Sequence, residues 1–157
     1  MTLRINNFET NFAASLPETY ALLLSSNLTV HPLVSRIILH GSRGLAGGCR
    51  PDSDIDLSLV VDLPPDTDTE RQLQDVLETT LSQWHGPVEL DLAVVFDIRG
   101  CDLKCFDWRV WSEQACKLGG TDCFGLYKTQ KGFNGLVTNA GIQVKLMYPC
   151  LKIWQRT

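Results

Sequence analysis

Apolar and polar positions follow different spacings in different segments of this chain. Three short runs of apolar and β-branched residues are bounded by turn-forming residues, which is typical of buried strands. We therefore predict three strands, at residues 36–40, 55–61 and 88–96. The first run stops at Gly41, where a glycine-rich segment over residues 41–51 begins, and Leu63-Pro64-Pro65-Asp66 breaks the second.

Helical spacing is clearest over residues 67–84, where apolar side chains recur at every third or fourth position between polar ones. This spacing indicates an amphipathic helix with one buried face. Residues 17–26 also favour a helix, because Pro17 stands at an early position ahead of an apolar body. The pattern further predicts a helix over residues 106–118 and a short helical turn over residues 32–35.

The last stretch of the chain favours short strands around Gly132, Gly135 and Gly141. Residues 142–147 are the most strand-like of this stretch, and Pro149 favours an edge strand or a turn for the segment after it. This mixture of elements predicts an α/β (α+β) fold with a small mixed β-sheet flanked by helices. The length of 157 residues predicts a single domain over residues 1–157.

The composition, 44% hydrophobic and 20% charged, is that of a globular protein and excludes a disordered one. No apolar run approaches the roughly 20 residues that cross a bilayer, and residues 1–11 lack the apolar block of a secretory signal. We therefore expect a cytoplasmic protein without membrane contact, whose six cysteines are reduced. Four of them form no tight CxxC pair, so buried thiols are favoured over a zinc site at Cys101, Cys105, Cys116 and Cys123.

Charge is divided unevenly along the chain. Residues 1–100 carry 6 basic and 14 acidic groups, whereas residues 101–157 carry 8 basic and 4 acidic groups. This division is compatible with a metal-binding site facing a phosphate-binding surface, but charge alone favours a solvated strand face. Tyr127, Lys128 and Lys131 are the basic-region candidates for a partner surface.

Two carboxylates occur in the segment Asp54-Ile55-Asp56. On a strand, residues two apart project to the same side, so both carboxylates face one way while Ile55 faces apolar packing. Neighbouring carboxylates repel each other, and a hard cation such as Mg²⁺ removes that cost. In residues 88–92 the same alternation places Glu89 and Asp91 on one face, so either could supply a third carboxylate.

Gly41-Ser42 follows directly after the first predicted strand. Glycine lets the backbone approach a ligand closely, and the free N–H groups of a following helix start would suit phosphate. A plain turn between two elements is the alternative for these two residues.

These elements, in this order, resemble the nucleotidyltransferase fold of the DNA polymerase beta superfamily. The family pattern is an apolar strand, Gly-Ser, roughly ten further residues, Asp-apolar-Asp, and a later strand with a third carboxylate. The match is closest to the minimal bacterial-type nucleotidyltransferases, through Gly41-Ser42-Arg43 and the run from Arg50 to Leu57, RPDSDIDL. It covers about residues 30–97, and residues 98–157 would complete the sheet or cap the site. The loop after Ser42 is one residue longer than the commonest minimal form.

The resemblance implies a role for each matching residue. Asp54 and Asp56 would hold two Mg²⁺ ions, and Asp91, with Glu89 as second choice, would bind the ion that activates the attacking group. The Gly41 N–H and Ser42 would hold the β- and γ-phosphates of a nucleoside triphosphate. Arg43 and Arg50 would neutralise phosphate charge or, alternatively, are surface arginines.

The implied function is that of a Mg²⁺-dependent nucleotidyltransferase acting on a nucleoside triphosphate and an unidentified acceptor. Minimal members of the family also act as the antitoxin half of a two-protein pair, so a partner protein or a homodimer is an alternative. A nucleotide-binding module with little turnover is a further alternative, and tight triphosphate binding without pyrophosphate release would identify it.

Overall fold

The computed structural model describes residues 2–62, 68–116, 119–130, 132–138 and 141–157. Over these residues the chain is of the α+β class, with a mixed six-stranded sheet and three α-helices. Within the same part of the chain, no helix is long and apolar enough to cross a membrane.

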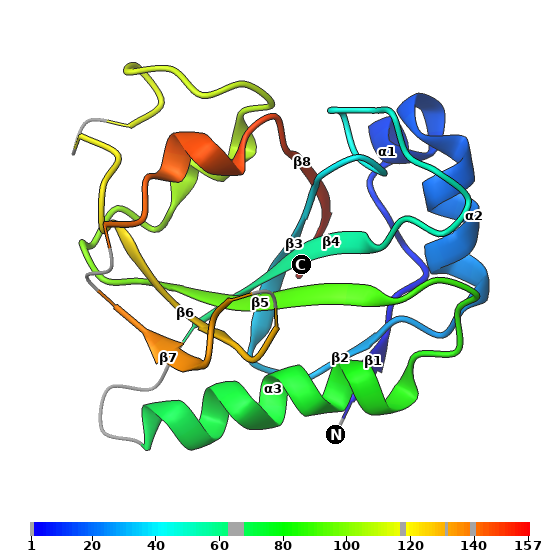
Figure 1. The fold of residues 1–157 in the computed structure, drawn as a ribbon, viewed down its shortest axis with the longest axis horizontal. Helices are drawn as coiled ribbons and strands as arrows, with labels where there is room; N and C mark the ends of the chain where they lie inside the picture. The colour runs from blue at the N-terminus through cyan, green and yellow to red at the C-terminus, as the bar shows by residue number, and fades with distance from the viewer. Residues whose placement is uncertain (1, 63–67, 117–118, 131, 139–140) are drawn as a thin grey trace.

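The main sheet has the strand order β7-β6-β5-β4-β3-β8 (Figure 1). In chain order its strands are β3 (Val34–His40), β4 (Ile55–Val61), β5 (Leu90–Asp97), β6 (Phe124–Lys128), β7 (Gly135–Val137) and β8 (Leu151–Gln155). The central pair, β4 and β5, is parallel, and every other neighbouring pair is antiparallel. A separate two-stranded sheet joins β1 (Leu3–Arg4) and β2 (Thr29–Val30).

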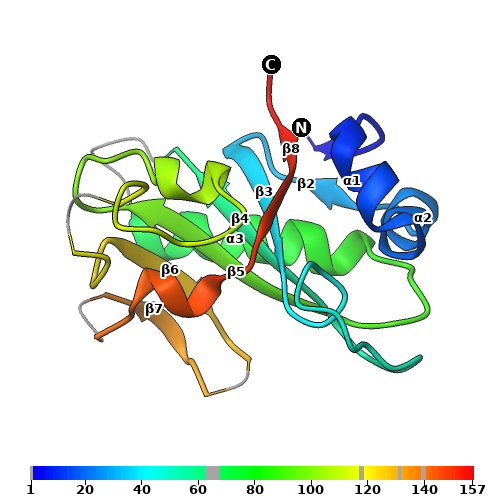
Figure 2. The same cartoon turned by 90° about the horizontal axis from the view of Figure 1, so that it is seen from above.

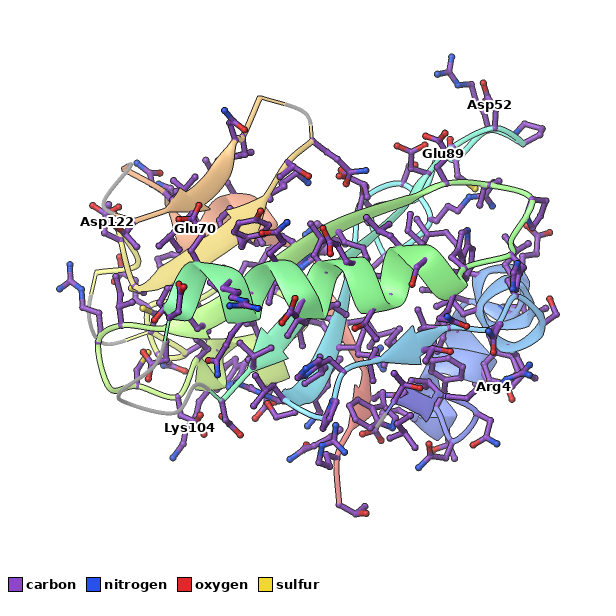
Figure 3. The ribbon with its side chains drawn as sticks, turned by 90° about the horizontal axis from the view of Figure 1, so that it is seen from below. Arg4, Asp52, Glu70, Glu89, Lys104 and Asp122 are labelled. Carbon is purple, nitrogen blue, oxygen red and sulfur yellow. The ribbon has the colours of Figure 1, made fainter. Side chains whose placement is uncertain are left out.

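The helices are α1 (Thr10–Ser15), α2 (Pro17–Ser25) and α3 (Thr69–Gln83). The longest of them, α3, lies in the connection from β4 to β5, as parallel neighbours require a crossover. It lies along one face of the sheet, as the view from below shows (Figure 3), and buries Leu73, Val76 and Leu77. The Asp68 carboxylate accepts a hydrogen bond from the Arg71 N–H and so caps the first turn.

Side chains alternate between the two faces of the sheet and supply two separate cores. Leu57 and Leu92 belong to the core shared with the helices, whereas Val60 and Val95 belong to the core on the other face. That second face is covered by two 3₁₀ turns, η1 (Lys104–Asp107) and η2 (Val144–Met147), and the irregular segments around them (Figure 2). By the same alternation, Asp56 and Asp91 belong to this second face.

The predicted framework of the first hundred residues is confirmed. The three predicted strands correspond to β3, β4 and β5, and the two longer helices predicted there correspond to α2 and α3. The predicted break at residues 63–66 and the first predicted position of α3, residue 67, lie outside the described residues. The predicted helical turn over residues 32–35 is wrong, because the chain makes a tight turn there and β3 begins at Val34.

The helix predicted over residues 106–118 is also wrong. Among residues 106–116, which the structure describes, the helical segment is the short turn η1, and Trp108 is already in an extended conformation. Residues 117–118 lie outside the described residues. Phe106 is fully buried while Val110, four positions later, is 69% exposed, so the two cannot share a buried helix face. The Arg109 carbonyl instead accepts a hydrogen bond from the Cys150 N–H, which joins this segment to the C-terminal part of the chain.

The strand predicted over residues 142–147 is wrong for a related reason. A strand would place Val144 and Leu146 on one face, yet Val144 is fully buried and Leu146 is 76% exposed. The segment forms η2, and the Tyr148 N–H donates to the Lys145 carbonyl. The expectation that Pro149 precedes an edge strand or a turn is confirmed, because β8 is an edge of the sheet.

The six cysteines are free thiols that differ strongly in exposure. Cys49 is exposed in the glycine-rich segment, whereas Cys105, Cys123 and Cys150 are buried in the second core. Burial raises the pKa of the Cys150 thiol to about 12 and that of Cys123 to about 11. Reactivity follows the thiolate, which for a pKa of about 12 is only about one molecule in ten thousand at pH 8.

We therefore expect the native chain to react with iodoacetamide first at Cys49, as followed by mass spectrometry of the intact protein and its peptides. Cys49→Ser is expected to remove the fast phase while leaving the slow phases unchanged. Equal rates at Cys49 and Cys150 in the native state would contradict the packing of the second core.

Candidate functional site

The strand register gathers three of the predicted site residues at one end of the sheet. β3 ends at His40, which pairs with Asp56 on β4, and Gly41 follows directly. Asp56 in turn pairs with Asp91 on β5. Residues that are register partners on adjacent strands project from the same face, so the two carboxylates are neighbours.

Gly41, the first residue of the glycine-rich segment, lies against the Asp56 carboxylate. Its φ of +76° lies in the left-handed region, and a Cβ at this position would overlap the Asp56 carboxylate. Glycine is therefore the residue that adopts this φ without strain and also leaves room for the Asp56 carboxylate. After Gly41 the chain makes consecutive turns rather than starting a helix, with the Gly44 N–H donating to the Gly41 carbonyl. The N-terminal helix turn considered for phosphate binding is thus replaced by a tight loop.

Two pockets meet at Asp56. A polar pocket of about 260 Å³ lies on the side of the loop, and its lining residues are Ser42, Arg50, Asp52, Ser53, Asp54 and Asp56. A second pocket, of about 370 Å³, has polar walls on the strands, including Asp56, Asp91 and Lys128. Its other wall is largely apolar and comes from residues 146–149. Asp56 thus borders both a mainly polar pocket and a half-apolar one.

Asp54 lies one position before β4 and borders the polar pocket together with Asp56. Between them, Ile55 is fully buried in the helix-side core. The Ile55 N–H donates to the Glu89 carbonyl, which ties the start of β4 to the chain just before β5. Ile55 therefore faces the core while Asp54 and Asp56 face the pocket, as the alternation in the sequence predicts.

Asp91, rather than Glu89, is the third carboxylate next to Asp56. Asp91 lies on β5 and is only 8% exposed, whereas Glu89 precedes the strand and is exposed. Figure 3 shows Glu89 near the same outer end of the sheet as the loop residue Asp52. Alternation puts Glu89 and Asp91 in equivalent positions, but Leu90 is where β5 begins, so only Asp91 is on the strand.

Lys128, a candidate for a partner surface from the sequence, contacts the carboxylate of Asp91 in this site. The Lys128 Nζ lies 2.6 Å from Asp91 Oδ1, and the two side chains are only 11% and 10% exposed. Lys128 ends β6, which pairs with β5 in antiparallel register. The pairing of β5 with β6 is not visible in the sequence, so alternation within each strand could not have identified this contact. Tyr127, the neighbouring candidate, is buried, and Lys131 lies outside the described residues.

The donor set suits a magnesium ion that is completed by substrate. Within the described ranges, no group of three or more His, Cys, Asp or Glu side chains is arranged to hold a metal ion, which also applies to the cysteine set considered for zinc. Mg²⁺, however, is usually bound through one or two carboxylates together with phosphate oxygens and water. Asp54 and Asp56, which border one polar pocket beside Ser42, match that mode of binding.

Arg43 stabilises the loop from inside. It is 7% exposed, and its guanidinium donates hydrogen bonds to the carbonyls of Ser53, Arg50 and Pro51 at distances of 2.7, 3.2 and 3.0 Å. The Thr19 hydroxyl on α2 donates to the Arg43 carbonyl. The guanidinium thus contacts the loop backbone, and of the two arginines it is Arg50 that borders the polar pocket with the Asp pair.

We expect Arg43→Met to destabilise the fold by about 2–4 kcal/mol, because the loop loses three hydrogen bonds from a charged donor that is itself buried. Urea unfolding of the variant measures this loss. Arg50→Met is the matched control, since the Arg50 side chain is 83% exposed and its ion pair to Asp52 is 3.9 Å long. We expect that control to change stability by less than about 0.5 kcal/mol. Equal losses in both variants would contradict the role assigned to Arg43.

His40 links the apolar wall of the second pocket to the strands. Its Nδ1 lies 2.8 Å from the Met147 carbonyl oxygen, and its Nε2 lies 2.8 Å from the Ser58 Oγ. Because a carbonyl only accepts, Nδ1 carries the proton and the Ser58 hydroxyl donates to Nε2. Burial lowers the pKa of His40 to about 4, against the opposing effect of the Met147 carbonyl, so the ring is neutral at pH 7.

Comparisons with protein-family models, with curated proteins and with solved structures give no match to this chain. The resemblance to nucleotidyltransferases therefore rests on the motif residues of the sequence.

Proposed function

We propose that this chain is a Mg²⁺-dependent nucleotidyltransferase that transfers a nucleoside monophosphate from a nucleoside triphosphate to an acceptor. The observation that carries the proposal is the contact of Gly41 with the Asp56 carboxylate, beside the register partner Asp91. This contact couples the Gly-Ser segment to the carboxylates, as the family motif requires. The mixed sheet, with a parallel central pair joined through α3, is compatible with a nucleotidyltransferase fold.

The two pockets at Asp56 suggest how the substrates are divided. The triphosphate would lie in the polar pocket, where Ser42 donates a hydrogen bond and Arg50 offsets phosphate charge. The acceptor would enter the half-apolar pocket beside Asp91. Asp56, which borders both, would then stand at the α-phosphate.

The reaction is an in-line displacement. An acceptor hydroxyl oxygen bonds to the α-phosphorus, the bond from that phosphorus to the bridging oxygen of the β-phosphate breaks, and pyrophosphate leaves. Asp54 and Asp56 would hold Mg²⁺, which when bound neutralises phosphate charge and lowers the pKa of the acceptor hydroxyl. The chain itself positions the two substrates and keeps their charges balanced.

Transfer of label from α-³²P nucleoside triphosphates to the small-molecule, protein and RNA fractions of a cell extract tests this proposal. We expect the parent chain to label one fraction in the presence of Mg²⁺, and we expect chelation of the metal to abolish labelling. Triphosphate binding without labelling of any fraction would instead identify a nucleotide-binding module. Labelling that survives in Asp56→Asn would exclude the carboxylate pair as its source.

A further inference from the structure

The half-apolar pocket beside Asp91 has two chemically different sides. The side on the strands includes the polar side chains of Asp56, Asp91 and Lys128. The opposite side is one continuous stretch of chain, residues 146–149 (LMYP), which we call the apolar wall. The volume of about 370 Å³ is that of a site for a small molecule. A ligand that fills this pocket must therefore match a polar and an apolar surface at the same time.

The apolar wall is held in place from two directions. On the side of the strands, the His40 Nδ1–H donates to the Met147 carbonyl over 2.8 Å. On the other side, the Tyr148 hydroxyl donates to the Cys105 carbonyl over 2.6 Å, and the Tyr148 ring lies 6.3 Å from the ring of Phe106, centroid to centroid. The wall is thus preformed, and a ligand that binds against it does not have to order the segment first.

Leu146 is the most exposed residue of the apolar wall. Its side chain is 76% exposed, although Val144, two positions earlier in the same 3₁₀ turn, is fully buried. A single exposed leucine is ordinary on a protein surface. Leu146, however, lines the same pocket as Asp56 and Asp91, so a ligand that spans the pocket covers its methyl groups. Covering them strengthens binding only if the ligand is apolar on that side.

We propose that the acceptor is a small molecule with an apolar ring or chain next to its reactive hydroxyl, and that Leu146 selects for it. This inference rests on the proposed function, because the pocket borders the same carboxylates. The hydroxyl would lie on the side of Asp56 and Asp91, with the apolar body against residues 146–149. A protein or an RNA strand is far larger than this pocket, whereas a small molecule can contact both of its sides at once.

Transfer of label from α-³²P nucleoside triphosphates to the small-molecule fraction of a cell extract, added in a dilution series, tests the proposal. We expect the labelled product to be retained longer than the nucleoside monophosphate on a reversed-phase column, because the acceptor adds an apolar group. Leu146→Ala should raise the amount of extract that gives half-maximal rate at least about tenfold, the effect of roughly two buried methylene groups. The maximal rate and the half-saturating triphosphate concentration should stay within about twofold of the parent.

Val110→Ala is the matched control, because Val110 is 69% exposed and does not line this pocket. We expect it to equal the parent in all three measures. Leu146→Met keeps an apolar side chain of similar size and is expected to retain most of the parent's affinity for the acceptor. Thermal unfolding of the three variants should stay close to that of the parent, because both substituted positions are exposed.

Three results would overturn the proposal. The first is label in the protein or RNA fraction in place of the small-molecule fraction. The second is an unchanged half-saturating amount of extract in Leu146→Ala. The third is a rise in the half-saturating triphosphate concentration alone, which would mean that the apolar wall holds the base of the donor. Failure of the proposed function has a different signature, because the folded parent would then label no fraction at all, and this inference would fall with it.

Discussion

Replacing Asp56 by asparagine is expected to lower the rate of nucleotidyl transfer by about a thousandfold or more. Asparagine has nearly the same shape, so the variant removes the charge with little change in packing. Asp56 borders both pockets and is the register partner of Asp91, so no other described side chain has its position between the two substrate spaces. Pyrophosphate release measured with saturating triphosphate and Mg²⁺ gives the rate directly.

The matched control is Asp75→Asn, which removes the same charge from the exposed surface of α3. The carboxylates of the site belong to the sheet face opposite the one that α3 covers, so we expect this control to transfer nucleotide at the parent rate. Thermal unfolding of both variants should stay close to that of the parent. A rate for Asp56→Asn within about tenfold of the parent would contradict a direct role of this carboxylate in catalysis.

We expect the substitution Gly41→Ala to have the second large effect, and to affect function more than folding. The backbone at Gly41 has a positive φ, which costs a residue with a Cβ about 1–2 kcal/mol. The new methyl group would also overlap the Asp56 carboxylate, which is the flexible end of a side chain and can move away. We therefore expect a moderate loss of stability, together with at least a tenfold loss of Mn²⁺ affinity because the carboxylate is displaced.

Gly47→Ala separates the two causes. Gly47 has nearly the same φ, +73°, but a Cβ there would meet nothing within 4 Å. Its loss of stability in urea unfolding therefore measures the backbone term alone, and Mn²⁺ affinity should not change. If both variants bind Mn²⁺ as the parent does, the contact between Gly41 and Asp56 does not position the metal ligand.

The central strands and the helix α3 could be predicted because each makes a strong local pattern. Residues 36–40, 55–61 and 88–96 are short runs rich in apolar and β-branched residues, and such runs are typical of largely buried strands. The segments after residue 100 gave wrong predictions because their apolar residues pack as irregular chain. Phe106 and Val144 are buried by contacts across the second core, whereas neighbours such as Val110 and Leu146 are exposed. Helix and strand periods describe neither arrangement.

The contacts of the site also differ in whether local sequence patterns could predict them. Strand ends and alternation predicted which way Gly41, Asp56 and Asp91 would face, and the pairing of β3 with β4 and of β4 with β5 makes them neighbours. Lys128 reaches Asp91 only because β6 pairs with β5, and Arg43 turns inward because the loop folds back over its guanidinium. Both contacts depend on pairing and loop closure between distant residues, for which the sequence shows no periodic signal.

The most direct test of the nucleotidyltransferase proposal is a calorimetric titration of the parent and of Asp56→Asn with ATP, GTP, CTP and UTP, each with and without Mg²⁺. We predict that at least one triphosphate binds the parent only when Mg²⁺ is present, and that this binding disappears in Asp56→Asn. The base that binds most tightly then identifies the donor nucleotide. If the folded parent binds none of the four triphosphates, or if Asp56→Asn binds as the parent does, the assignment of this site to nucleotidyl transfer is wrong.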